Sequence, residues 1–382
     1  MRRILLSIIF LSICGFLQAA DDYEKMAQAV REEVWNWDLP AFNNRVIPAE
    51  YDTCSAVILA RHEQIFVGTK KKIRYDPMTI LARNAELTYT NTDRMMIKIN
   101  DKRALDNYSE IEFQQMKKSY GYRIQNTFTS IIGARIIKPD GNIIEIDASQ
   151  SIALLDEKSD KQRKLTIPNL QVGDILDYFY YDEYKMDNQD IHSLIFHLAS
   201  STPMLSYSIH CEAEKGIRLE YRPYNNAPDF TSSNAPETNN LILDLQTADI
   251  QTYRSEIWTN AIRNFPLIRM NIIHIDNKNI ARPKREDNQS MLIKNPSYQQ
   301  VIEDTKWSAS LESRGFYYDR KGSLFFEKKI KNLKDKYVSN HPNASLDEIS
   351  AFIFYAQRFY AFNTITEESK ILVDADRNFR KA

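Results

Sequence analysis

Glycine, cysteine and unbalanced charge are all scarce in this sequence, and each shortage argues against a class of function. Nine glycines among 382 residues form no GxGxxG or GxxxxGKS/T pattern, so a glycine loop that cradles phosphate is not expected. The 50 Lys and Arg residues balance the 51 Asp and Glu residues, and no basic stripe is interleaved with aromatic residues. Nucleic-acid binding is therefore not expected either.

The six histidines also follow no metal-binding pattern. No HExxH sequence occurs. His192 and His197 are five residues apart, which on a helix would point their side chains about 140° apart. The sequence predicts no metal site and no cofactor.

Long apolar runs are absent except at the N-terminus. Arg2 and Arg3 precede an apolar stretch over residues 4–16, and the small residue Ala19 follows. This order is typical of a secretory signal peptide, here residues 1–19. We therefore expect an exported protein of the periplasm or cell envelope. No second run of eighteen apolar residues follows, so no transmembrane helix is expected once the signal is removed.

Three cysteines are present, and none carries a catalytic prediction. Cys14 lies within the apolar run of the signal, whereas Cys54 and Cys211 lie in strand-like stretches 157 residues apart. Two separate buried thiols are the expected state of this pair, and the sequence leaves open whether they form a disulfide. His210 precedes Cys211, but adjacent side chains of a strand point to opposite faces, so the imidazole should not reach the thiol. No catalytic residue is predicted.

Residues 51–275 show mostly strand patterns. The clearest hairpin joins residues 134–136 to residues 143–146 through a Pro-Asp-Gly-Asn turn, in which Gly141 can adopt a positive φ. Residues 225–240 are rich in Asn, Pro, Ser and Thr and are predicted to form a loop. A helix is expected over residues 183–200. The many short strands and turns favour a mainly β fold built from antiparallel β-sandwich units.

A C-terminal α-helical segment is expected to follow the β part. Phe326, Ile330, Leu333 and Tyr337 recur at helical spacing. Farther on, Ser345 and Glu348 form a capping box that predicts the start of a second helix. The apolar stripe behind this box consists of Ile349, Phe352, Ile353, Ala356, Phe359 and Tyr360.

One stretch, NLQVGDILDYFYYDEY over residues 169–184, holds four tyrosines. On a strand, Asp177 and Phe179 would share one face, and Tyr178 and Tyr180 would share the other. Both faces are thus mostly apolar or aromatic, which favours a strand covered on both sides. The alternative is that Tyr178 and Tyr180 form a ligand face that stacks against sugars.

Three stretches resemble a known family: GARIIKPDGNIIEI, LTIPNLQVGDILDYFYY and EIWTNAIRNFPLI. The chain resembles bacterial exported proteins, common among Bacteroidetes, that join a domain of unknown function (DUF3857-like) to a transglutaminase-like domain. The resemblance covers roughly residues 51–268. In addition, FYAQRFYAF is similar to the helix that precedes the catalytic helix of transglutaminase-like domains. Their chemistry needs a Cys–His–Asp triad, and the matching slot at residues 374–377 holds no cysteine.

The sequence patterns together with the resemblance predict five regions. They are a signal peptide (1–19), a β-sandwich domain (20–200), a second β unit packed on the first (201–276), a linker (277–296) and the helical start of an incomplete transglutaminase-like domain (297–382). The expected function is that of a non-catalytic envelope module that binds or positions a peptide, a glycan or a protein partner. The alternative is the N-terminal fragment of a cysteine peptidase or transglutaminase whose triad lies beyond residue 382.

Overall fold

The computed structural model describes residues 23–76, 80–121, 124–157, 159–254, 261–277, 280, 290–297, 299–300, 302 and 320–363. The chain forms two compact units, residues 1–296 and residues 297–382. The fold is mainly β with helices near the C-terminus, which confirms the predicted fold class. The predicted signal peptide (1–19) and the slot at 374–377 lie outside the described residues.

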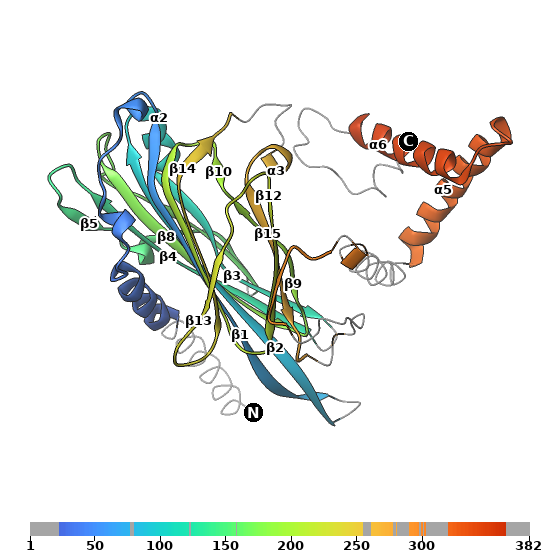
Figure 1. Ribbon diagram of the computed structural model, residues 1–382, viewed down its shortest axis with the longest axis horizontal. Helices are drawn as coiled ribbons and strands as arrows, with labels where there is room; N and C mark the ends of the chain where they lie inside the picture. The colour runs from blue at the N-terminus through green and yellow to red at the C-terminus, as the bar shows by residue number, and fades with distance from the viewer. Residues whose placement is uncertain are drawn as a thin grey trace, which may run out of the picture. The chain divides into compact units, whose positions relative to one another are not determined.

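Within the described residues, the first unit contains two sheets (Figure 1). The larger sheet has the order β10-β14-β11-β1-β2-β8-β4-β3-β7-β6, with β13 paired to β14 and β5 paired to β4. Its strands are β1 (Ala56–Asp76), β2 (Ile80–Ile99), β3 (Glu110–Gly121), β4 (Ile124–Ile137), β5 (Ile143–Glu145), β6 (Ile152–Asp156), β7 (Asp160–Thr166), β8 (Ile175–Asp187), β10 (Ala199–Ser200), β11 (Met204–Ala213), β13 (Thr231–Asn234) and β14 (Leu241–Thr252).

The smaller sheet has the order β16-β12-β15-β9. Its strands are β9 (Ile191–His197), β12 (Ile217–Tyr224), β15 (Leu267–His274) and β16 (Leu292–Lys294). Short helical segments connect the strands: η1 (Pro40–Asn43), η2 (Ala49–Tyr51), α2 (Lys102–Tyr108), η3 (Ala148–Gln150) and α3 (Ala261–Asn264). Strands β11 and β14 thus extend the larger sheet, whereas β12 and β15, from the same predicted region 201–276, belong to the smaller one.

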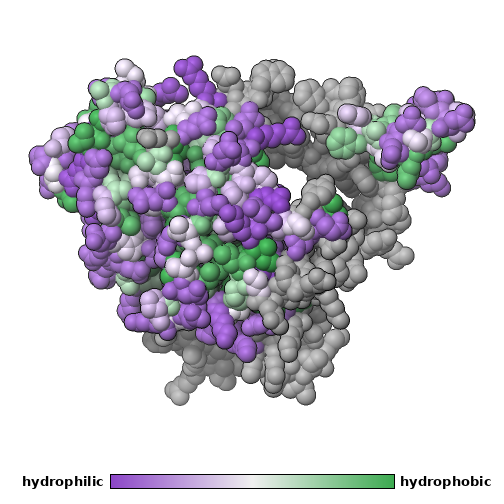
Figure 2. Space-filling view, viewed as in Figure 1, coloured by the Kyte–Doolittle hydropathy of each residue, from purple (hydrophilic) through white to green (hydrophobic). Residues whose placement is uncertain are grey.

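The two sheets share one apolar core. Ile65 of β1 and Leu87 of β2 belong to the same buried cluster as Leu219 of β12 and Ile268 of β15. Period-2 alternation produces this packing, because every second residue of each strand turns toward the other sheet. Figure 2 shows hydrophilic residues over much of the described surface in this view, with apolar residues in patches between them. We call the core-facing side of the larger sheet its inner face and the opposite side its outer face.

A helix over residues 23–35, dark blue in Figure 1, covers part of the outer face. Its residues Val30 and Val34 pack against Phe179 of β8. Phe179 therefore lies on the covered outer face, while Tyr178 belongs to the inner core cluster. The strand is covered on both sides, as one of the two sequence interpretations expected.

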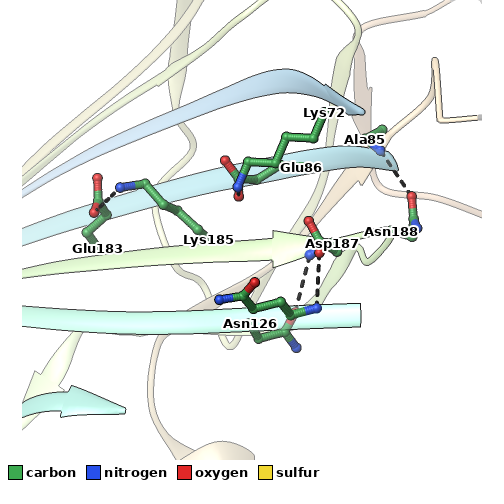
Figure 3. Close-up of polar contacts among 9 residues, drawn as sticks. Lys72, Ala85, Glu86, Asn126, Glu183, Lys185, Asp187 and Asn188 are labelled. Atoms are coloured by element: carbon green, nitrogen blue, oxygen red, sulfur yellow. Dashed lines mark hydrogen bonds and ion pairs between the residues drawn. The ribbon is translucent and has the colours of Figure 1, made fainter. Parts of the chain in front are cut away.

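Side-chain hydrogen bonds join the end of β8 to the neighbouring strands β4 and β2 (Figure 3). The backbone N–H of Asp187 donates to the side-chain oxygen of Asn126 at 3.2 Å. Asn188 has a φ of 51°, and its side chain accepts from the backbone of Ala85 at 3.1 Å. The chain then crosses to β9 in the smaller sheet. The predicted helix over residues 183–200 is therefore wrong, because strand pairing in two sheets overrides the local pattern.

Several local predictions are confirmed. Strand β4 pairs with β5 through Ile136 and Ile144, and Gly141 in the connecting turn has a φ of 89°. The predicted loop at residues 225–240 is wrong in part, because β13 lies within it. The stretch 277–296 likewise contains strand β16.

The second unit contains two helices among its described residues, α5 (Arg320–Asn340) and α6 (Leu346–Asn363). The capping box is confirmed. The backbone N–H of Ser345 donates to the Glu348 carboxylate at 2.7 Å, and the backbone N–H of Glu348 donates to the Ser345 hydroxyl at 3.3 Å. In the part of the chain that the structure describes, every helix is too short or too polar to cross a bilayer.

Candidate functional site

A cleft of about 760 Å³ lies on the outer face where the N-terminal helix leaves the sheet uncovered. This volume falls within the range of small-molecule binding sites. We call it the outer cleft. Its walls are formed by Leu39, Pro40, Ala41, Phe42, His62, Gln64, Ser208, Ile209, His210, Asp229, Thr231, Asp244, Leu245 and Gln246.

The polar side chains of the outer cleft form two rows across neighbouring strands. In the first row, His62 of β1 is paired with Ser208 of β11, and Ser208 is paired with Gln246 of β14. The second row lies two residues away from the first along β1, β11 and β14, in the direction in which β1 and β11 run. Since side chains alternate with period two, both rows point to the same face. The second row consists of Gln64, His210, Asp244 and Thr231, which pair in that order.

His62 forms the buried end of the first row. Its Nδ1 lies 2.8 Å from Oγ of Ser208, and its ring stands edge-on to Trp37 with centroids 5.4 Å apart. Only 5% of His62 is exposed. Burial lowers the pKa of His62 to about 4. The imidazole is therefore neutral at pH 7.

The second row carries the charge. Nδ1 of His210 lies 2.7 Å from Oδ1 of Asp244, and both side chains reach solvent. At the same end of the outer cleft, Asp229 accepts from Nζ of Lys294 at 2.6 Å. Carboxylate, imidazole, hydroxyl and amide groups thus meet on one wall and offer both donors and acceptors to a polar ligand.

The chemistry of the described residues does not favour a nucleophile. A serine beside a histidine suggests a Ser–His pair, but an imidazole with a pKa of about 4 is a poor base at neutral pH. Cys211 faces the core, and burial raises its pKa to about 12. Cys54 and Cys211 are both free thiols. As the alternation predicts, His210 points to the outer face while its neighbour Cys211 points inward.

Tyr178 and Tyr180, the residues proposed from the sequence as a ligand face, lie on the inner face. Their rings meet edge-on with centroids 5.8 Å apart. Tyr178 is 7% exposed, and Tyr180 is partly exposed. Burial raises the pKa of both phenols, that of Tyr180 to about 12. They lie outside the outer cleft, and a ligand role for them stays a prediction.

A charged cluster lies beside these tyrosines. Asp93, paired across the strands with Tyr180, accepts two hydrogen bonds from Arg61 at 2.9 and 2.8 Å. Arg61 also contacts Glu63 at 2.7 Å, and the hydroxyl of Tyr207 donates to Glu63. Burial raises the pKa of the Glu63 carboxyl. These groups satisfy one another, which indicates a structural role in the core.

Sequence reasoning did not assign the outer cleft, because its residues are far apart along the chain. His62 and Ser208, for example, are separated by 146 positions. One signal was available: Ser206, Ser208, His210 and Glu212 alternate with buried residues along β11. Such alternation indicates that one face of the strand is accessible to solvent, and a histidine on that face indicates a candidate site. Among the described residues, no group of three His, Cys, Asp or Glu side chains is placed to hold a metal ion.

The same region of the chain is similar to a known family. Residues 85–254 match DUF3857, a domain of unknown function with a solved structure. The DUF3857 match includes the walls of the outer cleft from β11, β13 and β14. It begins after β1, so His62 and Gln64 lie outside it. No curated protein matches the chain.

The solved structures that are similar to the chain include the following two. A protein from Parabacteroides distasonis, described as a "putative protease", has 11% identity and a TM-score of 0.39, with 57% of this chain and 40% of that chain covered. A Legionella pneumophila protein described as a "putative nutrient binding protein" has 8% identity and a TM-score of 0.25, with 86% of this chain and 92% of that chain covered. At these TM-scores neither structure informs the fold or function of this chain.

Proposed function

We propose that the first unit is a non-catalytic binding module of the cell envelope and that the outer cleft holds its ligand, a peptide or a glycan. The observation that carries the proposal is the pairing of His210 with Asp244 in a solvent-accessible, polar cleft. Polar groups that converge in a concave site fix the orientation of a ligand. The low pKa of His62 and the burial of Cys211 support binding rather than nucleophilic chemistry.

The test is ligand binding by the purified chain. A panel of immobilised oligosaccharides and peptides is screened, and each hit is titrated by calorimetry. His210→Ala and Asp244→Asn should each weaken binding at least about tenfold, since each variant leaves a polar partner unpaired. His192→Ala is the matched control, because His192 is an exposed histidine of β9 in the smaller sheet. Binding that survives both cleft variants would place the ligand elsewhere and refute the proposal.

Export is part of the same proposal. The order of Arg2, Arg3, the apolar run and Ala19 supports it. Fractionation of expressing cells should place the protein in the periplasm or envelope, with an N-terminus near residue 20. Replacing Arg2 and Arg3 by Glu should retain the longer form in the cytoplasm. A full-length chain in the cytoplasm of unmodified cells would contradict export.

A further inference from the structure

One edge of the larger sheet is open beside the outer cleft. Strand β13 pairs with Leu241–Asp244 on the side of β14 that faces away from β11, and β10 pairs with Gln251 and Thr252 at the C-terminal end of β14. Residues 245–250 lie between them and pair with β11 on their other side, but among the described residues no strand pairs with them on the side that faces away from β11. Six residues of strand span about 20 Å. The gap is therefore long enough for one short additional strand.

The direction of the backbone groups can be derived from the neighbouring bonds. The carbonyl of Asn240 accepts from the N–H of Ala235 at 2.9 Å, on the β13 side of the hairpin. The carbonyl of Asp244 accepts from the hydroxyl of Thr231, also on this side, at 3.1 Å. Since backbone groups alternate along a strand, Gln246 and Ala248 direct their N–H and C=O groups toward the gap.

Both residues are accessible. Gln246 and Ala248 are exposed, whereas their neighbour on β14, Leu245, is buried in the core. The described contact at this edge is weak: the Thr247 hydroxyl lies 3.4 Å from the carbonyl of Ala248. An exposed row of strand N–H and C=O groups is a template for another strand.

The segment that precedes β13 is anchored away from the open edge of β14. Phe230, the residue before β13, turns into the core, where its ring meets Tyr221 edge-on at 5.2 Å. Asp229 then reaches Lys294 of β16. The chain is therefore held away from residues 246–248 by an apolar anchor and an ion pair.

We propose that an extended peptide adds to β14 between β13 and β10 and places alternate side chains over the outer cleft. This inference rests on the proposed function and names its ligand class. Strand addition supplies main-chain hydrogen bonds for affinity, and pockets for alternate side chains supply selectivity. Gln246 belongs both to the open edge and to the outer cleft, so one peptide can engage the two together.

Charge selects among peptides. Asp229 and Asp244 carry the two carboxylates at this end of the outer cleft. Lys294 and His210 already contact these carboxylates, and their remaining acceptor oxygens favour a peptide side chain that donates hydrogen bonds over an acidic one. A glycan or a second copy of the chain would use these groups differently, and the experiment separates all three.

The probe is a random heptapeptide phage library selected on the intact chain, followed by synthesis of the enriched peptide. Two versions of that peptide carry N-methyl groups at alternate positions. One version blocks the N–H groups that face β14, and the other blocks those that face away. We expect one version to lose affinity about tenfold or more and the other to stay within about twofold.

The matched protein variants are Ala248→Pro and Ala248→Ser. Proline removes the outward N–H at an edge position that tolerates it, whereas serine retains the N–H. Peptide affinity should fall about tenfold in Ala248→Pro and hold in Ala248→Ser. Hydrogen exchange should slow at Gln246 and Ala248 when the peptide binds. The N-methyl pair decides the question if Ala248→Pro does not fold.

Four results would overturn strand addition. Equal affinity of both N-methylated peptides would exclude main-chain pairing. Binding by a glycan with no enriched peptide would leave the proposed function intact and remove the peptide. Concentration-dependent dimers that Ala248→Pro abolishes would assign the edge to a second copy. Failure of both peptide and glycan panels would remove the proposed function together with this inference.

Discussion

Arg94 and Asp177 form a double hydrogen bond beneath the N-terminal helix, at 3.0 Å from Nε and 2.8 Å from Nη2. Both residues are almost fully buried, at 2% and 0% exposed. Asp177 also accepts from Arg135 at 2.9 Å, and Nη1 of Arg94 donates to the carbonyl of Val34. One carboxylate thus holds two guanidinium groups that fasten the helix over residues 23–35 to the sheet.

The first prediction concerns this pair. Asp177→Ala should destabilise the first unit by about 3–5 kcal/mol, because it leaves two guanidinium groups without their carboxylate. Chemical denaturation of the purified chain measures the loss. Asp229→Ala is the control, since Asp229 lies at the surface and pairs with an exposed lysine; its cost should stay below about 1 kcal/mol. An equal loss of unfolding free energy in the two variants would show that the buried pair stabilises the fold no more than a surface ion pair does.

A second prediction concerns pH. The pKa of His62 is about 4 in the folded chain and near 6.5 when unfolded. Between these values the unfolded state binds more protons, so protonation favours unfolding and stability falls as the pH is lowered from 6.5 to 4.

His62→Gln removes this titration. The difference in unfolding free energy between the original chain and His62→Gln should change by up to about 1.4 kcal/mol per pH unit within the window and flatten above it. Denaturant titrations at several pH values measure the difference. His192→Gln, at an exposed position, should run parallel to the original chain. A pH-independent difference for His62→Gln would mean that His62 titrates normally.

The third prediction concerns the cross-strand pair Gly133 and Phe179. The Phe179 ring, fully buried, lies over Gly133, and a Cβ there would overlap it. Gly133→Ala should cost about 1–3 kcal/mol through overpacking. Gly141→Ala should cost about 1–2 kcal/mol through its φ of 89° without disturbing any ring.

Fluorescence separates the two glycine variants. Trp35 meets Phe179 edge-on at 4.9 Å, so Gly133→Ala should shift the tryptophan emission whereas Gly141→Ala should not. An unshifted spectrum together with unchanged stability would show that the ring moves aside freely.

The fourth prediction concerns thiol reactivity. Cys211 is 0% exposed and its pKa is raised to about 12, whereas Cys54 is partly exposed. In the Cys54→Ser variant, the folded mature chain should react with Ellman's reagent only as fast as it unfolds. In Cys211→Ser, reaction should be faster than unfolding. Rapid labelling of folded Cys54→Ser would reveal a route from solvent to Cys211.

Local signals predicted local structure well. The Gly141 turn, the two faces of β8 and the Ser345 capping box depend on neighbours within a few residues, and all three are confirmed. The helix predicted over 183–200 failed because β8 and β9 gain their stability from strands distant in sequence. His62 and Ser208 meet only because β1 pairs in parallel with β11, a register that no short window of sequence encodes.

The parallel pairing of β1 with β11 has a practical consequence for dissecting this protein. Strand β1 stands between β11 and β2, and β2 follows it in a long hairpin. A fragment trimmed to residues 85–254, the span of the family match, would lack β1. The larger sheet would then divide into two parts, and β11 and β2 would each have an unpaired edge. Shortened versions that begin near residue 23 preserve the whole ladder and are the proper starting point for biochemistry.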